Sequence, residues 1–501
     1  MLENPGFNVF AGLFSVALVC IFFGIIYLSL CSWKSLSSRS SKLSAIFITA
    51  VYLAVFVIQF PGLVESDDCI MLRKLVMFGM PSDWLGICYS LINAAGYLLI
   101  RNLGIIPIIN LLLFSHLMLK SLQRIEFLFA SNSKHLKISL FIFTLLLLSP
   151  VHFSQVFVHA RDTTAHLLIL LICTYALSEA PFRTKRRLVI FAATLMLIST
   201  LKVDNRLYLL LIPLVLVCLK RLSLKAAFAV VAVNALFMFI VSASINHYFN
   251  FPAFSPLYNS SSYLLPLAEV SREVQVANIP DTYKTPMQKV IDLDKHILMN
   301  SGFNLDASAI KKNADGTPAA TEQDWNEFQH AVSGFLAEHP ITYLQSRNKF
   351  FFALSGLTSG PTYYVSDNLR LHRPEKCESE LKSINLNTPQ LVDRTMTESF
   401  LNKLITLLDL PLFKFSGLGG LFLGFLFITL CLAQPMRSPP LFWFSWLVIA
   451  KLVICYFAAP AVLFKYVYIG YLYPVFFFPD FLASFLNKGA AYAQRASRSI
   501  Q

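Results

Sequence analysis

The stretch NVFAGLFSVALVCIFFGIIYLSLCSW, residues 8–33, contains no charged side chain. A helix needs about 20 consecutive apolar residues to cross the hydrocarbon core of a bilayer. Runs of similar character recur along the 501-residue chain, of which 56% is hydrophobic and 14% is charged. Soluble domains carry about 25% charged residues, so this chain lacks the polar surface that a soluble protein of its length requires. The sequence therefore predicts an all-α polytopic membrane protein.

The formal net charge of +13 is concentrated in short basic clusters between the apolar runs. These clusters fall at residues 34–42, 120–137, 183–187, 220–225, 437 and 488–498. Cytoplasmic loops of membrane proteins carry such an excess of Lys and Arg. A nucleic-acid surface would instead interleave basic and aromatic side chains in one groove, and no such pattern accompanies the clusters. We therefore expect a bilayer and no nucleic acid among the partners.

The basic clusters also predict the topology. The segment before residue 8 contains Glu3 and no Lys or Arg, so we expect the N-terminus outside and the first span retained. Residues 86–100 are too short for a full crossing and are predicted to form a short or interfacial helix. About eleven crossings then place every basic cluster on one side, with the C-terminus in the cytoplasm. The expected spans are residues 8–33, 43–63, 104–119, 138–157, 163–180, 188–202, 206–219, 226–246, 412–433, 440–460 and 467–486.

The composition divides the chain into four predicted regions. Residues 1–246 form an N-terminal transmembrane module, whose acidic first outer loop covers residues 64–85. Residues 247–410 hold most of the acidic residues and several turn signals, so this long polar stretch is predicted to be a mixed outer domain. Residues 411–486 contain the C-terminal spans, and residues 487–501 form a basic cytoplasmic tail.

Charged residues and tyrosines recur where the predicted spans reach the outer face. The candidates that share this position are Asp67, Asp68, Arg161, Asp162, Lys202, Arg206, Lys465 and Tyr466. A charge near the hydrocarbon edge is costly, which makes each one a candidate functional residue. Such residues also commonly anchor helix ends, so an anchoring role stays open for each of them.

Three histidines flank Arg161-Asp162 and are spaced seven residues apart: His152, His159 and His166. On a continuous helix this spacing would place them on one face. Pro150 and a turn expected at Arg161-Asp162 interrupt the helix, so a metal site here is the less favoured interpretation.

The cysteines give one further expectation. Cys69 and Cys377 fall in segments predicted to face the oxidising side of the membrane, where a disulfide between them is an open possibility. The remaining cysteines lie in or near predicted helices and are expected to pack as small apolar residues.

The candidate charges belong to longer motifs that follow one another in a set order. Pro61-Gly62 is followed by Asp67, then by Gly79 and Asp83-Trp84. Arg161-Asp162-Thr163 comes after a later span.

Two further motifs follow in the second half of the chain. Trp325 precedes Glu338-His339-Pro340 and Tyr343 in the polar stretch. Lys465-Tyr466 precedes Pro474 near the C-terminus.

This order of motifs resembles that of the GT-C superfamily of membrane glycosyltransferases, which use polyprenyl-phosphate sugars as donors. It is similar above all to a bacterial branch that includes serotype-converting enzymes. The chain departs from that branch at three places: Lys465 replaces an Arg, no His-Pro follows Trp84, and an Arg-x-Asn element is reduced to residues 202–205.

The resemblance implies a GT-C-like bundle of about eleven transmembrane helices in the bacterial inner membrane. The implied activity is transfer of a monosaccharide from a polyprenyl-phosphate donor to a surface glycan or glycolipid, such as the O-antigen of lipopolysaccharide. Asp67 would be the general base, with Asp68 as the second candidate. Asp162 would orient the acceptor or help to hold a divalent cation, Mg²⁺ or Mn²⁺, the one cofactor considered. Residues expected to contact substrate, mainly the donor phosphate, are Arg161, Lys202, Arg206, Lys465, Tyr466 and Trp84.

Two other classes stay open: a flippase or transporter for a lipid-linked saccharide, and a polysaccharide polymerase or ligase. Transporters usually place ionisable residues at mid-membrane and have small loops, whereas the acidic residues here lie at predicted helix ends beside a long polar stretch. The sugar donor distinguishes a GT-C transferase from a polymerase or ligase. The transferase uses a polyprenyl-phosphate sugar, whereas polymerases and ligases use a diphosphate-linked oligosaccharide.

Overall fold

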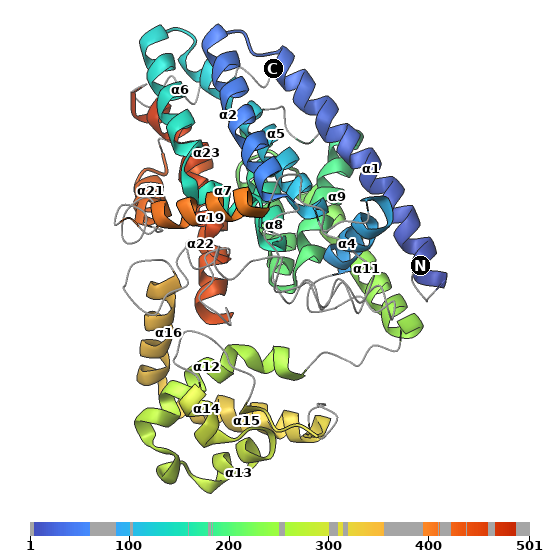
Figure 1. Cartoon of the computed structure of the whole chain (residues 1–501), viewed down its shortest axis with the longest axis vertical. Coiled ribbons are helices and arrows are strands. Elements are labelled where there is room, and N and C mark those ends of the chain that lie inside the picture. Colours follow the sequence, from blue (N-terminus) through green and yellow to red (C-terminus); the bar gives the residue numbers. More distant parts are fainter. Residues whose placement is uncertain are drawn as a thin grey trace. The chain divides into compact units, whose positions relative to one another are not determined.

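The fold is helical throughout the described part of the chain, as a computed structural model shows (Figure 1). The structure describes residues 5–60, 87–100, 104–158, 160–178, 182, 184–249, 256–299, 309–313, 319–354, 394–408, 410, 422–436, 438–458 and 466–486. Within these ranges the only β-type pairing is an isolated antiparallel bridge between Ile291 and Ile310. The all-α class predicted from the sequence is confirmed for these residues, and the mixed outer domain has no strand among them.

The chain forms two compact units. Unit 1 comprises Met1–Phe251, Val365–Ala450 and Tyr468–Gln501. Unit 2 comprises Pro252–Tyr364 and Lys451–Val467. Each unit is therefore assembled from stretches that are separated in the sequence. The domain boundaries that we expect from composition stay predictions.

Unit 1 is a bundle of mostly apolar helices. Its elements are α1 (Pro5–Lys34), α2 (Arg39–Gln59), α4 (Ile87–Ile100), α5 (Ile105–Phe129), α6 (Ser133–Leu147), α7 (Pro150–Val156), α8 (Arg161–Ser178), α9 (Lys185–Leu201), η1 (Val203–Leu207), α10 (Tyr208–Cys218), α11 (Leu224–Phe249), α19 (Arg394–Leu408), α21 (Phe422–Leu432), most of α22 (Pro439–Ala458) and α23 (Tyr468–Leu486). Among the described residues, five of these helices are long and apolar enough to cross a membrane: α1, α2, α5, α22 and α23. The count rises to six if α6 and α7 form one bent span. The figure of about eleven crossings stays a prediction.

Helix lengths in unit 1 follow from local sequence. The predicted span over residues 138–157 is bent by 55° between α6 and α7. Pro150 occupies the first turn of α7, where its missing N–H costs no hydrogen bond, and it disfavours helical geometry at Ser149. Helix α4 has 14 residues, in agreement with the short helix expected there.

Helix α5 is the centre of unit 1. It packs against α1, α2, α6, α8 and α23, and it is buried along most of its length. Helix α1 lies at the opposite extreme, because most of its apolar side chains are exposed, including Leu13 and Phe23 at 68% each. A helix that is apolar on all sides and exposed in this way is suited to contact with lipid.

Among the described residues, loops from several of the basic clusters meet at the C-terminal end of α5. The backbone N–H groups of Ser37 and Ser38 donate to the carboxylate of Glu126 over 2.9 and 2.7 Å. Arg124 forms a buried ion pair with Asp480 of α23. The backbone N–H of Phe182 donates to the carbonyl of Arg221, which joins two further loops. This clustering at one end agrees with the pattern that the positive-inside rule describes.

Unit 2 has a hydrophobic core of its own. Its helices are α12 (Pro256–Val274), η2 (Val276–Asn278), α13 (Asp281–Val290), α14 (Leu293–Met299), α15 (Glu322–Glu338) and α16 (Pro340–Leu354). Trp325, Phe328 and Phe335 on one face of α15 are buried against Leu264 and Met287. The Trp325 of the expected sugar-transferase motif is therefore a core residue.

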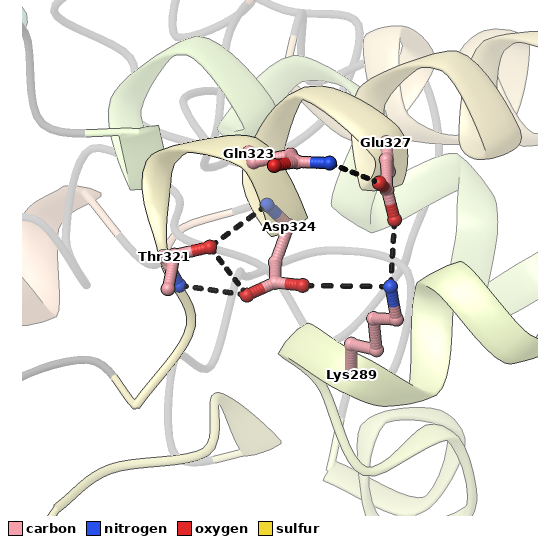
Figure 2. Close-up of polar contacts among 5 residues, drawn as sticks. All are labelled: Lys289, Thr321, Gln323, Asp324 and Glu327. Atoms are coloured by element: carbon pink, nitrogen blue, oxygen red, sulfur yellow. Dashed lines mark hydrogen bonds and ion pairs between the residues drawn. The ribbon is translucent and has the colours of Figure 1, made fainter.

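A polar network joins α13 to α15 on the surface of unit 2 (Figure 2). Thr321 and Asp324 form a reciprocal capping box that satisfies backbone N–H groups at the start of α15. Lys289 reaches across from α13, 2.7 Å from Glu327 and 3.6 Å from Asp324. These contacts lower the pKa of Glu327, chiefly through its hydrogen bond with Lys289, and lower the pKa of Asp324, chiefly through Thr321. The network therefore favours the charged forms of both carboxyl groups.

Candidate functional site

The structure describes five of the nine candidate residues. Arg161 and Asp162 form the first turn of α8, Lys202 is the C-cap of α9, and Arg206 lies exposed in η1. Tyr466 is buried in unit 2. The candidates Asp67, Asp68, Trp84 and Lys465 lie outside the described residues, as do His159, Cys69 and Cys377.

Asp162 and Lys202 meet at the junction of α8 and α9. The Lys202 ammonium lies 3.1 Å from one carboxylate oxygen of Asp162 and 3.4 Å from the other. The exposed fraction of the Asp162 side chain is 2%, and that of Lys202 is 6%. The α8 N-terminus further stabilises the negative charge of Asp162, because the backbone N–H groups of a first helical turn form the positive end of the helix dipole.

Asp204 completes this cluster. Lys202 has an extended backbone, and the short 3-10 helix η1 that follows turns the chain back, with the Asn205 N–H donating to the Lys202 carbonyl. The turn places a carboxylate oxygen of Asp204 3.1 Å from the Lys202 ammonium. One buried cation is thus held between two carboxylates, of which Asp204 is the more exposed at 22%.

Arg161 brings a second positive charge to the same place. Its guanidinium lies over the ring of Tyr89 from α4, 6.0 Å from the ring centroid. The neighbouring Cys88 accepts a hydrogen bond from Thr200 of α9 over 2.9 Å. Helix α4 therefore contacts both α8, through Arg161, and α9, through Thr200. We define the charged cluster as Arg161, Asp162, Lys202 and Asp204.

Neutral hydrogen bonds hold the start of α8 against α5. The Thr164 hydroxyl donates to the side-chain oxygen of Asn110 over 2.7 Å. The Asn110 amide donates to the carbonyl of Val158, in the connection between α7 and α8, over 3.5 Å. Because Asn110 and Arg124 are 14 residues apart on α5, about 21 Å at 1.5 Å per residue, the charged cluster lies at the opposite end of α5 from the basic loops.

A second buried polar cluster ties α7 to α23. Nδ1 of His152 lies 2.7 Å from the hydroxyl of Tyr468, and the hydroxyls of Ser149 and Tyr471 lie 2.9 Å apart. Tyr52 of α2 donates to the carbonyl of Leu147 over 2.8 Å. These bonds hold α7 in place. Because α7 precedes α8, they help to position Arg161 and Asp162 in the first turn of α8.

The described histidines do not gather into a metal site. His152 belongs to α7 and His166 to α8, on either side of the break in the helix. In the described ranges, no group of three or more His, Cys, Asp or Glu residues could hold a metal ion. The divalent cation suggested for Asp162 stays a prediction.

Two of the sequence motifs, Glu338-His339-Pro340 and Lys465-Tyr466, belong to unit 2. Helix α16 begins at Pro340, directly after Glu338 and His339, and its Asn348 accepts a hydrogen bond from Tyr456 of α22 over 3.0 Å. The carbonyl of Tyr466 accepts a hydrogen bond from the Cys455 thiol over 3.2 Å. The residues near Lys465 and the helix after His339 therefore belong to the same unit.

Sequence reasoning missed the partners of the candidate residues. Asp204 stands within the polar stretch between α9 and α10, so its two-residue distance from Lys202 was the available signal. Tyr89, Asn110 and Thr164 carry no charge and lie within apolar helices, where nothing in the sequence distinguishes them from ordinary packing residues.

The chemistry of the cluster suits an anionic or hydroxyl-bearing ligand. Lys202 and Arg161 are charge-assisted donors for phosphate, and the carboxylates of Asp162 and Asp204 are acceptors for hydroxyl groups. No protein-family model, curated protein or solved structure matches the chain.

Proposed function

We propose that the protein is a membrane glycosyltransferase that moves a monosaccharide from a polyprenyl-phosphate donor to a surface glycan or glycolipid. The acceptor would be a molecule such as the O-antigen of lipopolysaccharide, and the reaction would take place on the outer face of the bacterial inner membrane. The observation that carries this proposal is the buried cluster of Arg161, Asp162, Lys202 and Asp204, at the end of the bundle opposite the basic loops.

The proposed reaction needs a base and a stabilised leaving group. An acceptor hydroxyl attacks the anomeric carbon of the donor sugar, and the bond from that carbon to the phosphate oxygen breaks. Asp67 takes the hydroxyl proton, with Asp68 as the second candidate. The polyprenyl phosphate leaves with the bonding electron pair, and positive groups offset the charge that it develops.

The cluster supports this scheme through its arrangement. Lys202 is held by Asp162 and Asp204, so its ammonium is fixed in position before any ligand arrives. Preorganised charges of this kind lower a transition state more effectively than mobile ones, because they need no reorganisation during the reaction. Arg161, and with it Arg206 and Lys465, would contact the donor phosphate, while Tyr466 and Trp84 would contact substrate.

One observation favours the second candidate, a flippase or transporter for a lipid-linked saccharide. His116 lies at the middle of α5, 3.1 Å from the Ser29 hydroxyl and 2.7 Å from the Tyr175 hydroxyl. Ionisable groups at mid-membrane are typical of ion-coupled transporters. The transferase is preferred because the larger group of charged residues lies at a helix end.

The test compares surface glycans from cells that lack the protein, express it, or express Asp67→Asn or Asp162→Asn. We expect mass spectrometry to show an increment of one hexose or pentose in glycolipid or polysaccharide that depends on the native residues at both positions. Accumulation of undecorated or unpolymerised lipid-linked precursor in cells without the protein, with no such increment, would instead identify a flippase or polymerase.

Asp480→Asn is the matched control. It breaks another buried ion pair, with Arg124, at the opposite end of α5. If the increment depends on the charged cluster as such, Asp480→Asn retains it at equal protein level, whereas Asp162→Asn loses it. Equal loss in both variants would mean that the effect of Asp162→Asn is structural.

A further inference from the structure

Helix α19 has one buried face and one polar face. Leu401, Leu404 and Ile405 are buried, and they are spaced so that they share a side of the helix. The opposite side carries six polar residues at successive intervals of three or one: Thr395, Glu398, Ser399, Asn402, Lys403 and Thr406. Helix α19 is therefore amphipathic, unlike the apolar helices around it.

Helix α19 lies at the same end of unit 1 as the charged cluster. It packs against α2 and α7, and the Thr397 hydroxyl donates to the carbonyl of Ile58 over 2.9 Å. Ile58 belongs to the last turn of α2, whose first turn lies beside Glu126 at the basic end of the bundle. Helix α7 leads directly into Arg161 and Asp162. Figure 1 shows α19 lying across this end of unit 1.

The polar face of α19 borders a pocket of about 570 Å³, and the described residues that line it are the six polar residues named above. Pockets of about 300–1,000 Å³ are typical of small-molecule sites. Hydroxyl and amide groups both donate and accept hydrogen bonds, the Glu398 carboxylate accepts them and the Lys403 ammonium donates them, so this face can match the many hydroxyls of a sugar. Glu398 and Lys403 contribute opposite charges that sum to zero, which suits a neutral ligand better than a phosphate.

We propose that this face of α19 is the subsite that binds the acceptor, a neutral polyhydroxylated glycan. The inference rests on the proposed glycosyl transfer and adds to it the location of the acceptor. Binding on α19 would hold the glycan at the end of the bundle that contains Asp162, while the donor phosphate would bind at the cationic residues.

The test uses the full-length protein in nanodiscs and the double variant Ser399→Ala/Asn402→Ala. The probe is the glycan released by mild acid from the surface glycolipids of the cells that produce the protein. We expect saturation-transfer NMR to show binding to the native protein, weakened about tenfold in the variant, because two hydrogen bonds are lost. In transfer assays, the variant should raise the acceptor KM by a similar factor and leave kcat and the donor KM unchanged.

Met396→Ala is the control, because Met396 lies on the same helix, is exposed, and does not line the pocket. It should leave glycan binding unchanged. Unchanged binding in the double variant would overturn the acceptor subsite, even if the native protein transfers sugar. Binding that depends on Ser399 and Asn402 in a protein without transfer activity would support a glycan site on α19 and overturn the glycosyltransferase.

Discussion

Lys202 is a buried charged residue with two carboxylate partners. Its ammonium compensates Asp162 and Asp204 in a place that is almost closed to water. Burying charges is costly, and a buried pair remains tolerable only while both partners are present. The stability of this region should therefore depend on the partners together more than on either one alone.

Lys202→Met should destabilise the protein by about 3 kcal/mol, because it leaves the Asp162 carboxylate buried without its cation. The double variant Lys202→Met/Asp162→Asn should recover part of this loss, since the uncompensated charge is removed as well. Thermal unfolding of the purified protein in detergent measures both effects. Strict additivity of the two single changes would show that Lys202 and Asp162 do not interact.

The sequence predicted some of this cluster and could not predict the rest. Arg161, Asp162 and Lys202 were identifiable because charges are rare beside apolar runs, and the structure brings Asp162 and Lys202 into contact. The contact with Asp204 depends on the 3-10 turn after Lys202, a backbone detail that composition does not specify. The stacking of Tyr89 beneath Arg161 depends on the tertiary placement of α4.

Helices α21 and α23 approach each other closely at two glycines. A side chain at Gly424 of α21 would meet the backbone carbonyl of Gly470 in α23, with the carbonyl carbon 3.0 Å from the new Cβ atom. A backbone group cannot rotate away as a flexible side chain can. The pair therefore sets how closely α21 and α23 pack.

Gly424→Ala should lower stability by about 1–3 kcal/mol, because the two helices must separate to admit the methyl group. Gly24→Ala is the matched control, since a Cβ atom there meets nothing within 4 Å. It should be neutral or slightly stabilising, as Ala favours helix over Gly. A melting temperature unaffected by Gly424→Ala would contradict the close approach of α21 and α23.

The network between α13 and α15 predicts a pH dependence. Because the folded-state pKa of Glu327 lies below its ordinary value of 4.5, its stabilising contribution is present above that value and is lost as the pH falls through the folded-state pKa. Lys289→Met removes the principal cause of this shift. The variant should therefore lose about threefold in amide protection of α13 and α15 at neutral pH, and should show a smaller further loss on acidification.

Hydrogen exchange detected by mass spectrometry, corrected for the intrinsic rate at each pH, measures that protection. Lys284→Met is the control, because Lys284 lies on the same helix but outside the network of Figure 2. Similar acid profiles in the native protein and in Lys289→Met would show that Lys289 does not govern the titration of Glu327.

The elements themselves were partly predictable. Hydropathy located the long spans, and helix length predicted that α4 is short. The bend between α6 and α7 follows from Pro150, but the angle of 55° depends on the bonds that fix α7 to α23. The distribution of residues 247–410 between two units was not predictable, because a polar composition does not show which parts pack with the apolar helices.

At the scale of the whole molecule, the gathering of the basic loops at one end of α5 predicts an orientation. With that end in the cytoplasm, the charged cluster and α19 would lie at the outer end of unit 1. The proposed transfer requires this orientation, because lipid-linked donor and surface acceptor would meet on the outer face.

Cysteine labelling tests the orientation in intact cells. Ser131→Cys, in the turn between α5 and α6, should react with a membrane-impermeant maleimide only after permeabilisation, whereas Gln323→Cys at the start of α15 should react without it. The background should replace the following cysteines with Ala: Cys20, Cys31, Cys69, Cys218 and Cys377. The reverse labelling pattern would contradict the proposed topology and the outer location of the reaction.

The bonds between Glu126 and the turn before α2 have a consequence for how the chain is assembled during synthesis. The backbone N–H of Ser38, the residue that precedes the first turn of α2, obtains its acceptor from a residue 88 positions later in the sequence. The ribosome therefore delivers α1 and α2 to the membrane before the carboxylate that completes them exists, and water must solvate those N–H groups in the meantime. When α5 is inserted, the Glu126 carboxylate replaces water at these N–H groups. The bond can therefore form only after α1, α2 and α5 have all entered the membrane.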